Sequence, residues 1–446
     1  MAIRDDVLVV GGGLAGIAAA LAASDHADVR LLSHKQSTLR NASGLIDVLG
    51  YPPDAGDEAE PIVDPFDAFG DVPDGHPYER VGSEAVREGL ALFDDAVGDA
   101  YRGGHTDRNA LVPTHGGTVK PTARYPKSAA AGLASDGRDA LLVGFASLTD
   151  FDAPLAADHL AAAGVPFETR GVTIPFPGDF RDDAKVTRYA HALDRNESLN
   201  GTPARTALAE AVEPHLDGEA RVGFPAVLGD DDPAGVRASL ADTLGADVFE
   251  VPMGPPSLPG LRLEDRLYDA LDEAGVRVTT GNPAVDVETV DDRIRAVVVN
   301  RTGQPVPYHA DQVVLATGGL VGKGIDSDRE SVREPVFDCH VPHPEDRYDW
   351  FEGDAFGDHP FARFGVDVDR DLRPLAADGS IEYENLRAAG SVLGGYDFAA
   401  EKSGSGVSLA TGYAAGDAAG RAAASGATSD PAAGGTDGAT IHGDTQ

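Results

Sequence analysis

The sequence begins with a short apolar segment, a glycine-rich loop and an alanine-rich segment, and this order strongly constrains the fold. Residues 7–10 (VLVV) are too short for a helix, whereas residues 17–23 have the composition of one. A second apolar run at 29–32 completes a βαβ unit. The loop carries the pattern G-x-G-x-x-G, which binds a nucleotide phosphate at a helix N-terminus. Its glycines are Gly11, Gly13 and Gly16. The alternative is a glycine-rich turn without a ligand.

A stretch of small polar residues follows at 37–44 (STLRNASG). Small side chains allow close approach, and hydroxyl and backbone donors suit a phosphate or the edge of a flavin ring. We therefore predict cofactor contacts from Ser37, Thr38, Ser43 and Gly44. An ordinary surface turn is the alternative, because Ser and Gly are common in any loop.

Glycine-rich segments near the end of the chain connect the N-terminal loop to a flavin. An apolar strand at 312–316 runs directly into a Thr-Gly-Gly sequence, and a helix near Ser408 would point its positive end at the flavin pyrimidine ring. The predicted cofactor-binding residues here are Thr317, Gly318, Gly319, Gly390, Ser391, Gly394, Gly404, Gly406 and Ser408. Helix caps and loops are the alternative interpretation of the later glycines.

The residue after the second strand bears on which nucleotide is bound. In adenine-dinucleotide sites, Asp or Glu at this position accepts hydrogen bonds from the ribose. Residues 33–35 are Ser-His-Lys, so this carboxylate is missing. The ligand is then not a standard NAD, and the adenosine half is either absent, as in FMN, or held differently, as in FAD. The residues alone leave FMN and FAD both open.

These segments predict an α/β protein with a discontinuous, Rossmann-like flavin-binding domain and an inserted mixed α/β domain. We assign 1–50, 250–330 and 380–425 to the flavin domain, and 80–245 and 331–380 to substrate-side or partner-side segments. Residues 426–446 contain almost nothing to bury, so a disordered tail is expected.

The charge of the chain excludes some partners. Lys and Arg number 36 against 74 Asp and Glu, a net charge of −38 that makes nucleic acid an unexpected ligand. Acidic excess along the whole chain is the pattern of a halophile, in which salt screens the repulsion. No run of about 18 apolar residues occurs and the N-terminus does not resemble a signal peptide, so we expect a soluble, intracellular chain.

Metal and thiol chemistry are not expected. Cys339 is the single cysteine, so the chain holds no internal disulfide and no Cys-ligated iron–sulfur cluster. His340 and His343 flank a proline, which is poor geometry for two metal ligands. We predict no metal site and assign Cys339 no role.

With all these motifs in view, the chain resembles the B subunit of the anaerobic glycerol-3-phosphate dehydrogenase over nearly everything before the tail. The resemblance rests on VVGGGLAG, QSTLRNASGLIDVL, VGFASLTDFDAPLAADHL, PPSLPGLRLEDRL, VREPVF, EGDAFGDHPFARFGVDVDRDLRP and GSVLGGYD. It implies a glycerol-3-phosphate dehydrogenase (quinone) that oxidises sn-glycerol 3-phosphate to dihydroxyacetone phosphate. The resemblance also implies two partners, a catalytic A subunit, and an iron–sulfur C subunit, which would dock the complex on the cytoplasmic side of the membrane. FMN would be the cofactor of the present chain.

Two other functions stay open. The chain could be an electron-transfer and assembly subunit without a substrate site, or a free-standing FAD oxidoreductase on another small molecule. Alcohol oxidation by a flavin needs a base for the hydroxyl proton, and this substrate needs cations for its phosphate. No base stands out, and the catalytic residues remain unknown. The predicted phosphate contacts are Arg124, Lys127, Arg262 and Arg333, each with a structural ion pair as the alternative.

Overall fold

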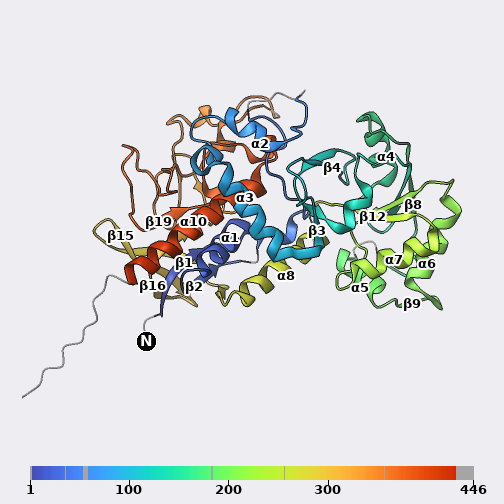
Figure 1. Ribbon diagram of the computed structural model, residues 1–446, viewed down its shortest axis with the longest axis horizontal. Coiled ribbons are helices and arrows are strands. Elements are labelled where there is room, and N and C mark those ends of the chain that lie inside the picture. The colour runs from blue at the N-terminus through green and yellow to red at the C-terminus, as the bar shows by residue number, and fades with distance from the viewer. Residues whose placement is uncertain are drawn as a thin grey trace, which may run out of the picture.

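The computed structural model describes residues 3–35, 37–53, 59–181, 184–255, 257–355 and 357–427. The chain forms two lobes, each built around one main β-sheet (Figure 1). The larger lobe contains the blue N-terminal strands and the red C-terminal helix side by side, and the green and teal middle of the chain forms the smaller one (Figure 1). The predicted α/β class, with a discontinuous Rossmann-like domain and an insertion, is therefore confirmed.

The larger sheet has seven strands in the order β13-β2-β1-β16-β15-β14, with β19 beside β16. Strands β13, β2, β1 and β16 run parallel, as does β19, whereas β16, β15 and β14 form an antiparallel meander. The strands are β1 (Ile3–Val10), β2 (Val29–Ser33), β13 (Arg277–Thr280), β14 (Ala284–Val290), β15 (Arg293–Arg301), β16 (Gln304–Leu315) and β19 (Leu386–Ala388). The parallel core reads as continuous apolar runs because such a sheet is covered on both faces.

Two helices that are far apart in sequence pack closely on this sheet. Helix α1 (Leu14–Ser24) and helix α10 (Gly404–Ala427) meet along a stripe of glycines spaced four residues apart in α10: Gly412, Gly416 and Gly420. A Cβ atom added to Gly416 would lie 2.1 Å from the Ala19 carbonyl oxygen. Backbone therefore contacts backbone at this crossing, and the crossing fixes the C-terminal helix beside the N-terminal glycine loop.

The larger lobe also contains segments that the sequence analysis assigned elsewhere. Helix α3 (Pro77–Val97) packs on α10, where a Cβ on Gly89 would lie 2.7 Å from the Leu409 carbonyl. Side chains from 331–380, including Val332, Phe337 and Val366, are buried in the same core. Helix α8 (Leu258–Glu273) leads into β13. We propose that the inserted domain begins after α3, not at 80, and that 331–380 belongs with the flavin domain.

The smaller lobe has a four-stranded parallel sheet in the order β12-β11-β7-β8 and a core of its own. Its strands are β7 (Ala140–Phe145), β8 (Thr169–Ile174), β11 (Arg221–Pro225) and β12 (Asp247–Val251), and its helices are α4 (Ala153–Ala162), α5 (Val186–Asp194), α6 (Ala204–Val212) and α7 (Pro233–Leu244). A hairpin of β4 (Ala110–Pro113) and β5 (Val119–Thr122) accompanies this sheet.

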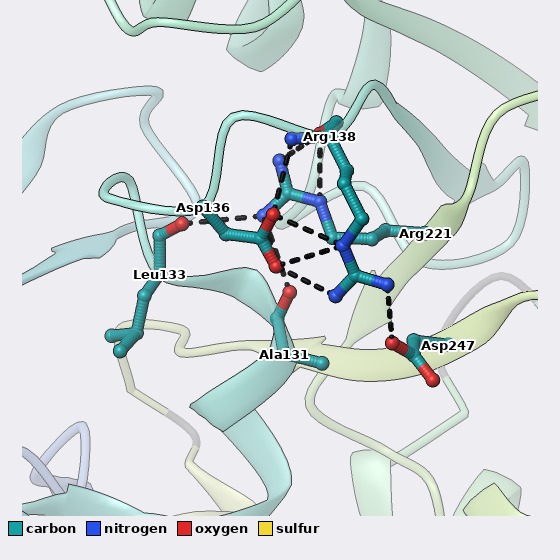
Figure 2. A network of polar contacts seen from close by, with 6 residues as sticks. All are labelled: Ala131, Leu133, Asp136, Arg138, Arg221 and Asp247. Atoms are coloured by element: carbon teal, nitrogen blue, oxygen red, sulfur yellow. Dashed lines mark hydrogen bonds and ion pairs between the residues drawn. The ribbon is translucent and has the colours of Figure 1, made fainter.

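A buried arginine connects this hairpin to the smaller sheet. The Arg221 guanidinium has no exposed surface and donates to the carbonyls of Ala131, Leu133 and Arg138 (Figure 2). The hydrogen bonds from Arg138 lower the pKa of Asp136 to about 2, which keeps that carboxylate charged beside the two guanidinium groups. The Ala134 amide then donates to the Leu111 carbonyl in β4 at 2.9 Å. The network thus fixes β4, and through it β5, on the smaller sheet.

The remaining elements are short. They are α2 (Pro65–Ala68), α9 (Phe398–Glu401), β3 (Tyr101–Arg102), β6 (Tyr125–Pro126), β9 (Ser198–Leu199), β10 (Thr202–Pro203), β17 (Asp326–Ser327) and β18 (Val332–Arg333). Within the described ranges, no helix is both long and apolar enough to span a bilayer. Of the predicted disordered tail at 426–446, the first two residues end α10 and the rest lie outside the described residues.

Replacing Gly416 with Val should force α1 and α10 apart. Because the added atoms would meet a backbone carbonyl and not a movable side chain, we expect a loss of about 1–3 kcal/mol in the free energy of unfolding, measured by denaturant titration. Gly426→Ala in the same helix is the matched control, since its added Cβ has no atom within 4 Å and should not destabilise the chain. Equal stability of Gly416→Val and the native chain would contradict the close crossing.

Candidate functional site

The glycine loop after β1 has the geometry that a phosphate-binding turn requires. Gly11 has φ +128°, and a Cβ on it would lie 2.0 Å from the Ala316 carbonyl oxygen. A Cβ on Gly16 would lie 1.8 Å from the Gly11 carbonyl oxygen, so the third glycine lets α1 pack on the loop. By contrast, a Cβ on Gly13 would meet nothing within 4 Å. Gly13 faces open space at the N-terminus of α1, where no side chain caps the helix amides.

A cavity of about 570 Å³ lies against this loop and contains much of the predicted site. Loops after β1, β2 and β16 meet the first turn of α10 around it, because the parallel strands end at one edge of the sheet. The predicted cofactor-binding residues that line it are Gly11, Gly13, Ser37, Thr38, Ser43, Thr317, Gly318, Ser391, Gly404 and Ser408.

The other predicted glycines are packed behind this lining and do not form it; they are Gly16, Gly44, Gly319, Gly390, Gly394 and Gly406. A Cβ on Gly44 would lie 2.8 Å from Pro259 Cβ, and one on Gly390 would lie 2.5 Å from Ala15 Cβ. Gly319 donates its amide to Ser391 Oγ at 3.1 Å. For Gly394 and Gly406 the neighbours are instead mainly backbone atoms, and the Tyr78 hydroxyl would lie 2.3 Å from a Cβ on Gly406. These glycines shape the loops without facing the cavity.

The chemistry of the lining fits a dinucleotide-type cofactor. Thr317 Oγ1 is buried with no hydrogen-bond partner among the described residues, although the residue lines the cavity. A buried hydroxyl without a partner costs free energy, so a ligand oxygen or nitrogen is the expected partner. The α1 amides add a second set of donors, suited to phosphate. The cavity also continues past the end of β2, where Ser33, His34 and Lys35 line it.

One end of the cavity contains a carboxylate and an ammonium group that the sequence analysis did not predict there. Asp47 is buried, accepts a hydrogen bond from Ser405 Oγ at 2.7 Å and lies 3.3 Å from Lys120 Nζ. All three residues line the cavity. Asp47 lies within the segment quoted for the family resemblance, whereas Lys120 lies on a hairpin without a motif. No sequence signal indicated that Lys120 would reach the site.

The four cations predicted to bind a substrate phosphate do not line this cavity. Arg124 Nε donates to Asp94 at 2.8 Å, and Lys127 lies 2.5 Å from Asp99. Arg262 lies 2.7 Å from Glu250, and Arg333 lies 4.0 Å from Asp326 on the surface. Each of these cations has an acidic neighbour, as is common in a chain with so many carboxylates, and their contact with a substrate phosphate stays a prediction.

Cys339 is buried, and the neighbouring His343 packs on an aromatic ring. Burial raises the pKa of the Cys339 thiol well above its usual range, so it is not an activated thiolate. His343 lies with its ring against Trp350, 5.6 Å between centroids, and Nδ1 is 2.6 Å from the Val341 carbonyl. Within the described ranges, no group of three or more His, Cys, Asp or Glu is arranged to hold a metal ion.

Comparison with protein families agrees with this geometry. The family model described as "FAD binding domain" matches residues 6–407, so the chain is a flavoprotein of this class. The chain is 66% identical over 421 residues to the probable B subunit of the anaerobic glycerol-3-phosphate dehydrogenase of Halobacterium salinarum, covering 93% of this chain and 98% of the relative. The chain belongs to the B-subunit family of anaerobic glycerol-3-phosphate dehydrogenase, as the sequence predicted.

More distant proteins extend this comparison. The B subunit of the same dehydrogenase from Vibrio cholerae is 31% identical over 427 residues, covering 92% of this chain and 94% of the relative. Among solved structures, quinol fumarate reductase FrdA of E. coli is 12% identical, covers 96% of this chain and 71% of that chain, and has a TM-score of 0.43. The similarity to the fumarate reductase is too low to say anything about the site of the present chain.

Removing the Arg262 charge should destabilise the fold without touching the cavity. Arg262→Met would leave Glu250, which is buried, without its cation, at an expected cost of about 3–5 kcal/mol in the free energy of unfolding. Adding Glu250→Leu should recover part of that loss, because an apolar pair needs no desolvation of charge. Full stability of the single variant together with weakened substrate binding would instead favour the phosphate role that the sequence suggested.

Filling the space beside Gly13 should expel the flavin and leave the fold intact. Gly13→Val adds atoms where the structure has none within 4 Å of the Cβ, so the thermal midpoint of the flavin-free chain should not change. Flavin affinity, measured by fluorescence titration, should fall at least about 10-fold, because the side chain would occupy the approach to the helix amides. Unchanged affinity would place the flavin elsewhere.

Proposed function

We propose that this chain is the flavin-bearing subunit of a quinone-linked glycerol-3-phosphate dehydrogenase. It would oxidise sn-glycerol 3-phosphate to dihydroxyacetone phosphate and pass the electrons through an iron–sulfur partner to quinone. The observation that carries the proposal is the pairing of Asp47 with Lys120 in the same cavity as the glycine loop, in a chain whose relatives are named as part of this dehydrogenase.

We propose FAD as the flavin, in preference to the FMN that the family resemblance implied. Two observations support FAD: the matching family model is one for FAD binding, and the cavity continues past the glycine loop to Ser33, Lys35 and Asn282. Lining of that extent offers room for an adenosine half without the usual carboxylate. FMN remains the alternative, and mass spectrometry of the released cofactor separates the two.

The residues at the end of the cavity where Lys120 lies would supply what alcohol oxidation needs from the protein. When bound, a flavin supplies the acceptor for a hydride. Among the described lining residues, Asp47 is the one carboxylate, and it would accept the hydroxyl proton of the substrate. Burial and the hydrogen bond from Ser405 hold its carboxyl group in one orientation. The first turn of α10 brings Gly404, Ser405 and Ser408 to the same end.

An electron-transfer and assembly function is the second candidate. The relatives are named as one subunit of a larger enzyme, so oxidation of the substrate could belong to another polypeptide of the complex. The same names disfavour a free-standing FAD oxidoreductase. We propose two partners, a catalytic subunit (the A subunit) and an iron–sulfur subunit (the C subunit), the second of which would attach the complex to the cytoplasmic face of the membrane.

Anaerobic reduction of the flavin tests the proposal. The full chain, loaded with flavin, should lose its absorbance near the flavin maximum when glycerol 3-phosphate is added without the catalytic partner, whereas glycerol, which lacks the phosphate, should have little effect. Absorbance loss only in the presence of the catalytic partner would favour the electron-transfer function. Absence of flavin from the purified chain would contradict both.

A further inference from the structure

The smaller lobe reaches the cavity through one side chain. Among the described residues between 59 and 281, which include the whole smaller lobe, Lys120 alone lines the cavity. Lys120 lies in β5, and its side chain is 23% exposed, so its charge is neither buried nor fully in solvent. The inserted domain thus contributes one described side chain to the cavity, and that side chain is a cation. This points to recognition of an anion.

Lysine is concentrated at this cavity. The chain has six lysines, and three of them, Lys35, Lys120 and Lys323, line it. A fourth, Lys402, lies close by: burial lowers its pKa, and the charge of Lys120 lowers it further. Among the described lining residues, three lysines stand against the one carboxylate of Asp47, so the lining carries a net positive charge in a chain whose net charge is −38. Such an arrangement favours an anion in the cavity.

The surroundings of Lys120 hold it in place. Arg221 donates to the carbonyls of Ala131 and Leu133, and the next residue, Ala134, donates its amide to Leu111 in β4, which pairs with β5. On the opposite side, the Gly406 amide donates to the Asp47 carbonyl at 2.7 Å. The loop before Gly406 is fixed in turn by the buried pair of His76 and Glu401, 3.1 Å apart. Lys120 and Asp47 thus face each other from two supported segments, one in each lobe.

We infer that Lys120 binds the phosphate of the substrate, in place of the four cations that the sequence suggested. An ammonium group has three donors, and the contact with Asp47 uses one. A flavin phosphate is the other possible source of the anion, but the glycine loop and the N-terminus of α1 already provide donors for that phosphate. The inference rests on the proposed function, because it takes a phosphomonoester alcohol as the substrate.

Three variants of the full chain test this inference, each loaded with flavin and assembled with its partners. Lys120→Gln removes the positive charge, whereas Lys120→Arg keeps the charge and the pairing with Asp47. Lys127→Gln is the control: Lys127 lies in the same region but pairs with Asp99 outside the cavity. We expect Lys120→Gln to raise the KM for glycerol 3-phosphate roughly 10- to 100-fold, with flavin content and kcat changed much less. Lys120→Arg should restore part of the affinity, and Lys127→Gln should behave as the native chain.

The outcomes separate the inference from the proposed function. An unchanged KM for glycerol 3-phosphate in Lys120→Gln would overturn the inference. Loss of flavin from this variant would also overturn it, because Lys120 would then contact the cofactor and not the substrate. Binding is also followed without turnover, by the change that glycerol 3-phosphate causes in the flavin spectrum. If the native complex binds this compound in a Lys120-dependent way but does not oxidise it, the inference stands and the proposed function fails. If the native complex neither binds nor oxidises it, both are wrong.

Discussion

The close approach of backbone to backbone around the glycine loop is the constraint on which the rest of the site depends. A Cβ on residue 11 would lie 2.0 Å from the carbonyl of Ala316, so β1 and β16 can end side by side only with glycine there. The same lack of side chains lets α10 lie directly on α1. Three segments that are far apart in the sequence therefore meet at one edge of the sheet, and the cavity forms where they meet.

Both lobes contribute to the cavity. The larger lobe supplies amides, hydroxyls and small residues, which suit a nucleotide, together with Lys35, Lys323 and Asp47, and the smaller lobe adds Lys120 opposite Asp47. In a chain with net charge −38, long-range electrostatics would repel an anionic substrate. A cation inside the cavity counteracts that repulsion at the place where the substrate would bind. High salt, which screens the surface carboxylates, would weaken a partly buried contact less.

Sequence patterns predicted the local parts of this site better than its long-range parts. The glycine loop could be predicted because each of its glycines meets a different requirement of the backbone within one short motif. The loops at 317 and 404 could be predicted because a strand or a helix adjoins them. Arg124 and Arg262 were singled out because cations are rare in this acidic chain, but both lie outside the cavity and pair with carboxylates, which are abundant here. Lys120 was missed because its position depends on the packing of a hairpin between lobes, which leaves no local signal.

A crystal structure of the flavin-loaded chain with glycerol 3-phosphate tests the central claim most directly, because it shows both ligands at once. The flavin is expected in the cavity beside Gly13 and Thr317, with the substrate phosphate within hydrogen-bonding distance of Lys120 Nζ. A flavin bound outside this cavity, or a substrate phosphate held by Arg124, Lys127, Arg262 or Arg333, would contradict this claim.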